Sequence, residues 1–170
     1  SFRNRPLGLV LNDLFEMSGV GINVDPRIAH RMGTLTFASF GDPVPLRDAW
    51  SGERKDALSL YLHVPFCEMR CGFCNLFTTV NPGDDLTRAW LAAIERQSSR
   101  VRDALGDARF ARLALGGGTP TWISTEALAS LFAIVDRFGV DLAVTPASVE
   151  TSPRTADAEK LRLLAERGVA

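Results

Sequence analysis

The chain has 170 residues, of which 46% are hydrophobic, and a formal net charge of −1. That length and apolar content suffice for one domain with a buried core, and so small a net charge predicts no polyanionic or membrane-surface partner. No apolar run approaches the roughly 20 residues of a membrane span, and no signal-like segment opens the chain, so composition favours a soluble cytoplasmic protein.

The first 50 residues are poorly patterned. Glycine and proline recur in them, after an apolar stretch at Leu7–Met17 that is compatible with a short helix. A second short helix is expected to begin within Pro45–Trp50 and to end at Ser51-Gly52. We therefore expect residues 1–50 to form an irregular lead-in with short helices, and residues 51–170 to form the folded core.

Both ends of the chain suggest a piece of a longer protein. The first residue is Ser1 rather than Met, and the chain stops at Ala170, just after a predicted helix that ends at Gly168. Glycine is typical of a helix C-terminus, and a further strand should follow in a strand–helix repeat. We expect a fragment that is truncated on its C-terminal side.

Three strand–loop–helix units follow the lead-in. Each predicted strand ends near a proline or glycine, and each is followed by a stretch with helical apolar spacing. Such a repeat favours an α/β fold with a parallel sheet and right-handed crossovers, either an open sheet or part of a barrel. The predicted strands are Ser59–Val64, Arg112–Leu115 and Ala147–Thr151, and the predicted helices cover about residues 84–105, 124–138 and 155–167.

Apolar spacing also predicts the buried face of each element. In the first strand, Leu60, Leu62 and Val64 should share one side, and Ser59, Tyr61 and His63 the other. The expected core residues of the helices are Leu86, Trp90, Ala93, Gln97 and Val101, then Leu128, Leu131, Phe132 and Val135, and finally Leu161, Leu164 and Ala165.

The loop after the first strand contains all three cysteines, Cys67, Cys71 and Cys74. Thiolates hold zinc or iron–sulfur clusters, and three protein ligands leave one coordination position open to substrate. An odd number of cysteines argues against a disulfide framework. The C-x3-C-x2-C spacing leaves two main readings: an open iron–sulfur centre, or a Cys3His zinc site with His63 as the fourth ligand. Three unreactive buried thiols fit the pattern less well.

Two further features follow the second and third strands. The run Gly116–Thr121 reads Gly-Gly-Gly-Thr-Pro-Thr, lacks the lysine of a phosphate loop, and offers amides that no side chain shields. Glu150 is an acid among small and apolar strand residues, where it needs a partner. The simpler interpretations are a plain flexible turn for the glycine run and a salt bridge to a neighbouring arginine for Glu150. Because ligands bind at the carboxyl ends of parallel strands, these features and the cysteine loop predict one site.

Together these motifs resemble the radical S-adenosylmethionine superfamily, in particular the group related to oxygen-independent coproporphyrinogen III oxidase. The resemblance rests on Tyr-x-His-x-Pro-Phe-Cys-x3-Cys-x-Phe-Cys from Tyr61, then the glycine run, then Val-Glu-Thr-Ser-Pro around Glu150. It covers about residues 58–170 and implies a partial (β/α)6 TIM-like barrel, truncated in this chain after about three βα units.

The resemblance also implies cofactors. A 4Fe–4S cluster would be bound by Cys67, Cys71 and Cys74, and the amino and carboxylate groups of S-adenosylmethionine would chelate its fourth iron. One-electron reduction would cleave S-adenosylmethionine to methionine and a 5′-deoxyadenosyl radical, which abstracts a hydrogen from a small-molecule substrate. His63 would be a polar neighbour of the cluster and not a ligand. The residues expected to contact S-adenosylmethionine are Tyr61, Phe73, Gly117, Gly118, Thr119 and Glu150.

One position departs from the resemblance. The oxidases carry a further cysteine two positions after the third ligand, where this chain has Leu76. We therefore expect a radical S-adenosylmethionine enzyme, oxidoreductase or methyltransferase-like, with an unassigned substrate. Its expected partner is a one-electron reductant such as flavodoxin or ferredoxin, with no nucleic acid and no membrane. A haem-binding or haem-trafficking relative with the same cluster core, and a zinc-stabilised binding module, are the alternatives.

Overall fold

The computed structural model describes residues 45–74 and 76–169, and the chain divides into two units, Ser1–Ala49 and Trp50–Ala170. The described part of the first unit contains one short helix, α3 (Leu46–Ala49), in the range where a short helix was predicted. The predicted helix at Leu7–Met17 lies outside the described residues.

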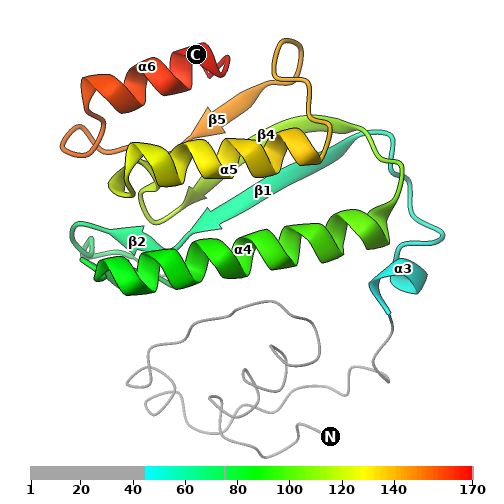
Figure 1. Ribbon diagram of the computed structural model, residues 1–170, viewed down its shortest axis with the longest axis horizontal. Coiled ribbons are helices and arrows are strands. Elements are labelled where there is room, and N and C mark those ends of the chain that lie inside the picture. The colour runs from blue at the N-terminus through cyan, green and yellow to red at the C-terminus, as the bar shows by residue number, and fades with distance from the viewer. Residues whose placement is uncertain (1–44, 75, 170) are drawn as a thin grey trace, which may run out of the picture. The chain divides into compact units, whose positions relative to one another are not determined.

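A parallel three-stranded sheet organises the second unit (Figure 1). Its strands are β1 (Leu58–Val64), β4 (Phe110–Gly117) and β5 (Ala147–Val149), in the order β1-β4-β5. Both pairings are parallel, with Leu62 opposite Leu115 and Leu115 opposite Val149. The predicted α/β class with a parallel sheet is therefore confirmed.

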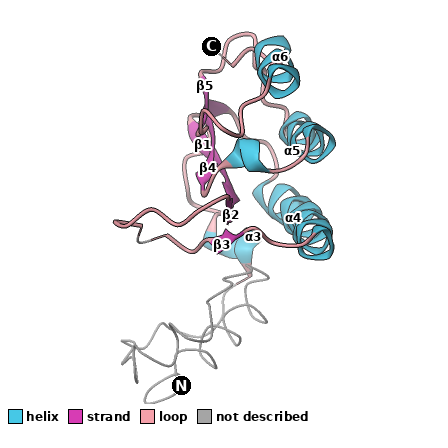
Figure 2. Ribbon diagram, turned by 90° about the vertical axis from the view of Figure 1, so that its left-hand side faces the viewer, coloured by secondary structure: helices cyan, strands magenta, loops and turns pink. Residues whose placement is uncertain are grey.

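Helices follow the strands of this sheet along the chain and lie together on one of its faces, as Figure 2 shows. They are α4 (Asp84–Leu105), α5 (Thr125–Arg137) and α6 (Ala158–Glu166), and a short 3-10 helix, η1 (Pro120–Trp122), precedes α5. Local sequence sets where they begin. Asp84 and Asp85 favour the positive N-terminus of α4, while Ser124 and Asp157 cap α5 and α6 by accepting hydrogen bonds from the amides of Ala127 and Lys160.

The core lies between the sheet and α5. The inward residues of β1 and β4 are buried, and Phe66 packs edge-on against Trp90, with ring centroids 5.1 Å apart. Helix α5 contributes five residues that are at most 1% exposed, which confirms its predicted face. The buried residues of this core include Leu62, Val64, Leu113, Leu115, Leu128, Leu131, Phe132, Ile134, Val135 and Leu164.

Two predicted helix faces are partly wrong. Leu86 is 39% exposed, and α4 packs on the core through Trp90, Leu91 and Ile94. Leu161 is 51% exposed, whereas Leu164 of the same helix is buried. A period of 3.6 residues predicts that a helix has an apolar face. Apolar residues one position apart lie on adjacent sides of the helix, so packing against the sheet decides which of them is buried.

Two strand boundaries also differ from the prediction. Strand β4 continues through Gly116 and Gly117, which pair with His63 and Val64. Strand β5 ends at Val149, so Glu150 follows the strand, although its amide still donates to the Leu115 carbonyl at 2.9 Å. The glycine run therefore begins inside the sheet.

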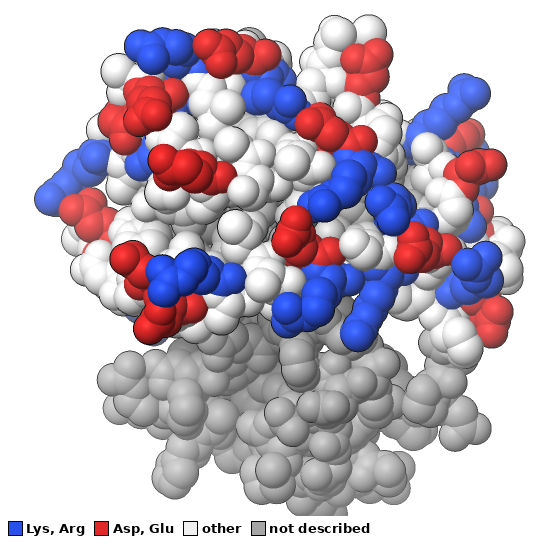
Figure 3. Space-filling view, in the orientation of Figure 1, with Lys and Arg blue, Asp and Glu red and all other residues white. Residues whose placement is uncertain are grey.

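The surface of this unit has no region of a single charge on the face that carries the helices. Basic and acidic side chains alternate there (Figure 3), in keeping with the small net charge. Among the described helices, none combines the length and the apolar character that crossing a membrane requires.

Candidate cofactor site

The carboxyl ends of β1, β4 and β5 bring the predicted motifs together. The cysteine loop follows β1, the glycine run completes β4, and Glu150 follows β5. Hydrogen bonds join them: Tyr61 to His63 within β1, and Gly117 of β4 to Glu150. The prediction that these residues share one edge of the sheet agrees with this geometry.

Each glycine of the run makes room for a different group. A Cβ atom on Gly116 would lie 2.9 Å from the Glu150 carboxyl carbon, and one on Gly117 would lie 2.3 Å from the His63 ring. Gly117 also has φ +109°, a conformation that side chains disfavour. A Cβ on Gly118 would lie 2.4 Å from the Phe66 carbonyl oxygen. The run is required for close packing, and is not a plain flexible turn.

The expectation that this run offers unshielded amides is wrong for three residues. The Gly117 amide donates to Glu150 Oε2 at 2.9 Å, the Gly118 amide to the Val64 carbonyl at 2.8 Å, and the Thr119 amide to the Phe66 carbonyl at 2.7 Å. Glu150 thus has a backbone amide as partner. In this arrangement these three amides are occupied, so a ligand at Gly117, Gly118 or Thr119 would have to contact other atoms of these residues.

Tyr61 and His63 point the same way from β1, as alternation predicted. The Tyr61 hydroxyl lies 3.2 Å from His63 Nδ1, and His63 Nε2 lies 3.2 Å from the Phe77 carbonyl oxygen. Tyr61 is 54% exposed, and partial burial followed by the Glu150 charge raises its pKa above the ordinary value. Because both ring nitrogens of His63 have partners, neither is available to a zinc ion here, which weighs against the Cys3His reading.

The cysteine loop is closed at its base by a two-stranded parallel ladder, β2 (Phe66–Cys67) with β3 (Thr79–Val80). All three cysteines are free, and Cys71 is exposed while Cys67 and Cys74 are half-buried. The Cys74 amide donates to the Cys71 carbonyl at 3.0 Å, which turns the backbone between them. Phe73, beside Cys74, is 91% exposed.

The electrostatic surroundings of the cysteines differ. Burial raises the pKa of the Cys67 thiol, and the Thr119 hydroxyl, 3.9 Å from its sulfur, opposes that effect. Hydrogen bonding to the backbone of Leu76 lowers the pKa of Cys74, and Thr78 and Arg70 act in the same direction. The surroundings of Cys74 therefore favour its thiolate, the form that binds metal.

The donor set fits a metal centre in its chemistry. Three unpaired thiols lie within eight residues on one loop, and soft thiolates are the ligands of iron–sulfur clusters. Within residues 45–74 and 76–169, no three His, Cys, Asp or Glu side chains are gathered closely enough to hold a metal ion. Binding a cluster would therefore require the loop to draw its sulfurs together.

Sequence reasoning missed the residues that fasten the loops of this edge. Arg154, after β5, forms an ion pair of 2.9 Å with Glu68 in the cysteine loop. Opposite charges on two loops predicted to meet at one edge were the signal available in the sequence.

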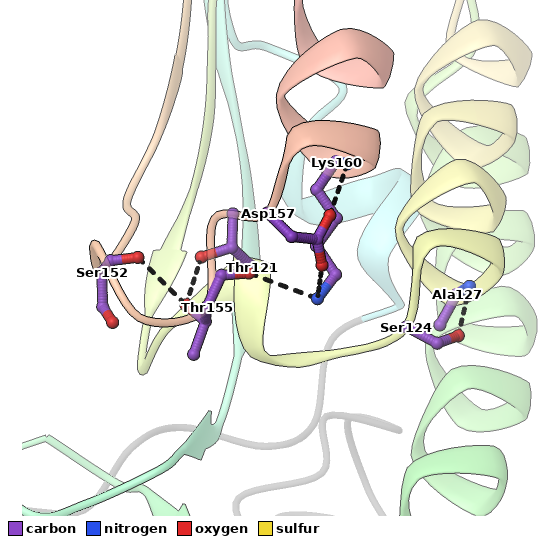
Figure 4. A network of polar contacts seen from close by, with 7 residues as sticks. All are labelled: Thr121, Ser124, Ala127, Ser152, Thr155, Asp157 and Lys160. Atoms are coloured by element: carbon purple, nitrogen blue, oxygen red, sulfur yellow. Dashed lines mark hydrogen bonds and ion pairs between the residues drawn. The ribbon is translucent and has the colours of Figure 1, made fainter.

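A second fastening joins the loops after β4 and β5 (Figure 4). The hydroxyl of Thr121, a fully buried residue, lies 2.7 Å from the hydroxyl of Thr155. Lys160 Nζ donates to the Thr155 carbonyl at 3.2 Å and pairs with Asp157. This network fixes the segment that follows Glu150.

Comparison with known proteins relates this core to one group. The chain is 40% identical over 115 residues to an oxygen-independent coproporphyrinogen III oxidase of Cereibacter sphaeroides, covering 66% of this chain and 25% of that protein. It is 34% identical over 117 residues to the haem chaperone HemW of Bacillus subtilis, covering 65% of this chain and 29% of that protein. No protein-family model matches the chain.

A solved structure gives the same relationship. The coproporphyrinogen III oxidase HemN of Escherichia coli, described as a radical SAM enzyme, superposes with a TM-score of 0.66 at 25% identity. The match covers 76% of this chain and 30% of that protein, and the chain spans about a quarter of the curated relatives' length. The fold of this chain is therefore similar to that of a solved radical SAM enzyme. In sequence it is similar to part of the oxygen-independent coproporphyrinogen III oxidases.

Proposed function

We propose that this chain is the N-terminal half of the catalytic core of a radical S-adenosylmethionine enzyme. One observation carries the proposal: the cysteine loop, the glycine run and Glu150 follow three parallel strands and meet at one edge of the sheet. The proposed cluster ligands are Cys67, Cys71 and Cys74, and the proposed contacts to S-adenosylmethionine are Tyr61, Phe73, Gly117, Gly118, Thr119 and Glu150.

The chemistry of these side chains suits a cationic nucleoside ligand. A carboxylate has about four lone-pair sites, so Glu150 can accept from a ligand ammonium group while it holds the Gly117 amide. The exposed Phe73 ring offers a flat apolar face to a base. Once bound, a reduced 4Fe–4S cluster would supply the electron that cleaves S-adenosylmethionine to methionine and a 5′-deoxyadenosyl radical.

The arrangement of helices supports the proposed partial barrel. A doubly wound sheet carries helices on both faces, whereas a (β/α) barrel carries them all on its outer face. Helices α4, α5 and α6 lie on one face only (Figure 2). The opposite face carries exposed or half-buried residues, among them Tyr61, His63 and Ser148, and would line the interior of the barrel.

The reaction that would follow radical formation is inferred from the relatives alone. Their names favour an oxidoreductase that acts on a porphyrinogen, a small-molecule substrate. The proposed partner is a one-electron reductant such as flavodoxin or ferredoxin, because the proposed cleavage of S-adenosylmethionine consumes one electron. Leu76 argues for a different substrate or reaction, methyl transfer included. This side chain is 46% exposed on the cysteine loop, where the oxidases carry a further cysteine. Action in the cytoplasm stays a prediction.

A haem-trafficking role is the second candidate, because the chain is 34% identical to a haem chaperone over 65% of its length. The two candidates differ in a measurable product. An enzyme releases 5′-deoxyadenosine from S-adenosylmethionine under reducing, anaerobic conditions, whereas a trafficking protein binds haem without that turnover.

Anaerobic reconstitution of the full chain with iron and sulfide tests the proposal directly. We expect the broad visible absorbance of an iron–sulfur cluster and about four irons per chain. Stoichiometric zinc with no colour would sink the proposal and favour the zinc-stabilised module.

A further inference from the structure

Three side chains at the carboxyl edge of the sheet contact the cysteine loop. After β4, the Thr119 hydroxyl contacts the sulfur of Cys67, and after β5, Arg154 pairs with Glu68. Both of these contacts hold the first part of the loop, at Cys67 and Glu68, where the chain arrives from β1. From β1 itself, His63 reaches across to the outgoing arm, where Nε2 lies 3.2 Å from the Phe77 carbonyl oxygen.

The contact between His63 and Phe77 fixes which ring nitrogen donates to that carbonyl. A carbonyl oxygen only accepts, so Nε2 must carry the hydrogen that it donates to Phe77. In a neutral imidazole Nδ1 is then an acceptor, and the Tyr61 hydroxyl at 3.2 Å is its donor. Tyr61 therefore orients the ring that holds Phe77.

The neighbouring strand β4 leaves the space that the His63 ring occupies. The His63 ring occupies the space that a side chain on Gly117 would fill, since a Cβ there would lie 2.3 Å from Cε1 and Nδ1. The backbone of Gly117 is held in turn by Glu150 through a hydrogen bond of 2.9 Å. The ring is thus constrained by β1, by β4 and by the residue after β5.

We propose that His63 is a positioning residue that holds the outgoing arm of the cysteine loop, residues 76–80, against the sheet and so sets where Cys74 lies. Cys74 is three residues before Phe77, and its sulfur lies 3.8 Å from the Thr78 hydroxyl, so a shift of this arm moves the thiol. The consequence for a cluster rests on the proposed function, in which Cys74 is a ligand. The hydrogen bond from His63 to the Phe77 carbonyl, called the tether below, does not depend on a metal.

Two matched substitutions separate the two contacts. In His63→Gln the side-chain amide nitrogen stands as many bonds from Cα as Nε2 does and can still donate to Phe77. In His63→Asn the amide stands at the position of Nδ1, near Tyr61, and is too short to reach Phe77. Hydrogen exchange of the metal-free full chain should be roughly fivefold faster at residues 76–80 in His63→Asn, from loss of one hydrogen bond, and near the native rate in His63→Gln.

Exchange in α5 is the control for the fold, because that helix lies in the core. If α5 also exchanges faster in His63→Asn, the decisive variant is Tyr61→Phe, which removes only the hydroxyl that orients the ring. It should then speed exchange at residues 76–80 and leave α5 unchanged. Equal exchange at residues 76–80 in native protein, His63→Asn and Tyr61→Phe would overturn the tether.

Iron bound after anaerobic reconstitution gives the second readout. We expect His63→Asn to bind less than half the iron of native protein and His63→Gln to bind nearly all of it. Faster exchange with undiminished iron would overturn the role in placing Cys74. If native protein itself binds no iron, the proposed function fails, while metal-free exchange still decides the tether.

Discussion

Cys71 is the proposed ligand that contributes least to the fold. Its side chain is exposed and is free of any disulfide, so replacing it removes a thiol without opening a cavity in the core. We predict that Cys71→Ala abolishes assembly of a complete cluster and leaves the urea unfolding midpoint unchanged. Iron analysis and circular dichroism of the full chain test this, and full iron in the variant would contradict the ligand assignment.

Two substitutions of Glu150 separate the effect of its negative charge from the effect of its hydrogen bond. Glu150→Gln keeps an acceptor for the Gly117 amide but removes the negative charge, whereas Glu150→Ala removes both. A hydrogen bond to a charged group contributes about 1.5–3 kcal/mol, so we predict roughly 10- to 100-fold weaker binding of S-adenosylmethionine in Glu150→Gln. Equilibrium binding to the reconstituted protein measures this.

Cluster content is the control for Glu150. Iron per chain should stay near the native value in Glu150→Gln. A variant that loses iron while its remaining cluster binds S-adenosylmethionine normally would make Glu150 a structural residue.

At the scale of elements, β4 ends in a glycine that the neighbouring strand requires. Gly117→Ala would place a Cβ within 2.3 Å of the His63 ring at a backbone φ of +109°. Overpacking and left-handed backbone strain together cost roughly 2–5 kcal/mol, so we predict a clear fall in the free energy of unfolding. Urea denaturation of the full chain provides the measurement.

Gly72 is the matched control for Gly117. It lies in the cysteine loop, and no atom would come within 4 Å of a Cβ added there. Gly72→Ala should change the free energy of unfolding by less than about 0.5 kcal/mol. Similar losses in both variants would show that the Gly117 site is not as crowded as the distances indicate.

The elements also show why sequence reasoning succeeded where it did. Strand β1 and helix α5 have strong apolar periods and single buried faces, so their residues were predicted correctly. The amides of the glycine run were misjudged because their partners, the Val64 and Phe66 carbonyls and Glu150, come from other segments. The cysteine motif could be read from spacing, whereas its fastening by Arg154 and Phe77 depends on how loops fold over the edge.

At the scale of the whole molecule, most residues that stabilise the described core lie apart from the residues proposed to bind cofactors. The buried residues lie between α5 and the inner side of the sheet, while the proposed ligand residues lie at the carboxyl edge or on the opposite side. The loops at that edge are held by hydrogen bonds and ion pairs in addition to the packing of Phe66 against Trp90 and Trp122. Changes to buried residues, Gly117 included, should therefore lower stability, and changes to exposed side chains of the edge should alter binding.

Phe132 and Leu161 test this separation and the corrected assignment of buried residues together. Phe132 is 1% exposed and has Arg167 5.1 Å from its ring centroid, so Phe132→Ala should lower the free energy of unfolding by roughly 3–5 kcal/mol. Leu161 has the apolar spacing of a core residue but is 51% exposed, so Leu161→Ala should cost less than about 1 kcal/mol. Urea denaturation of both variants measures the contrast. A large loss in Leu161→Ala would mean that α6 packs by the row that the sequence predicted, because only a buried leucine leaves a costly cavity on truncation.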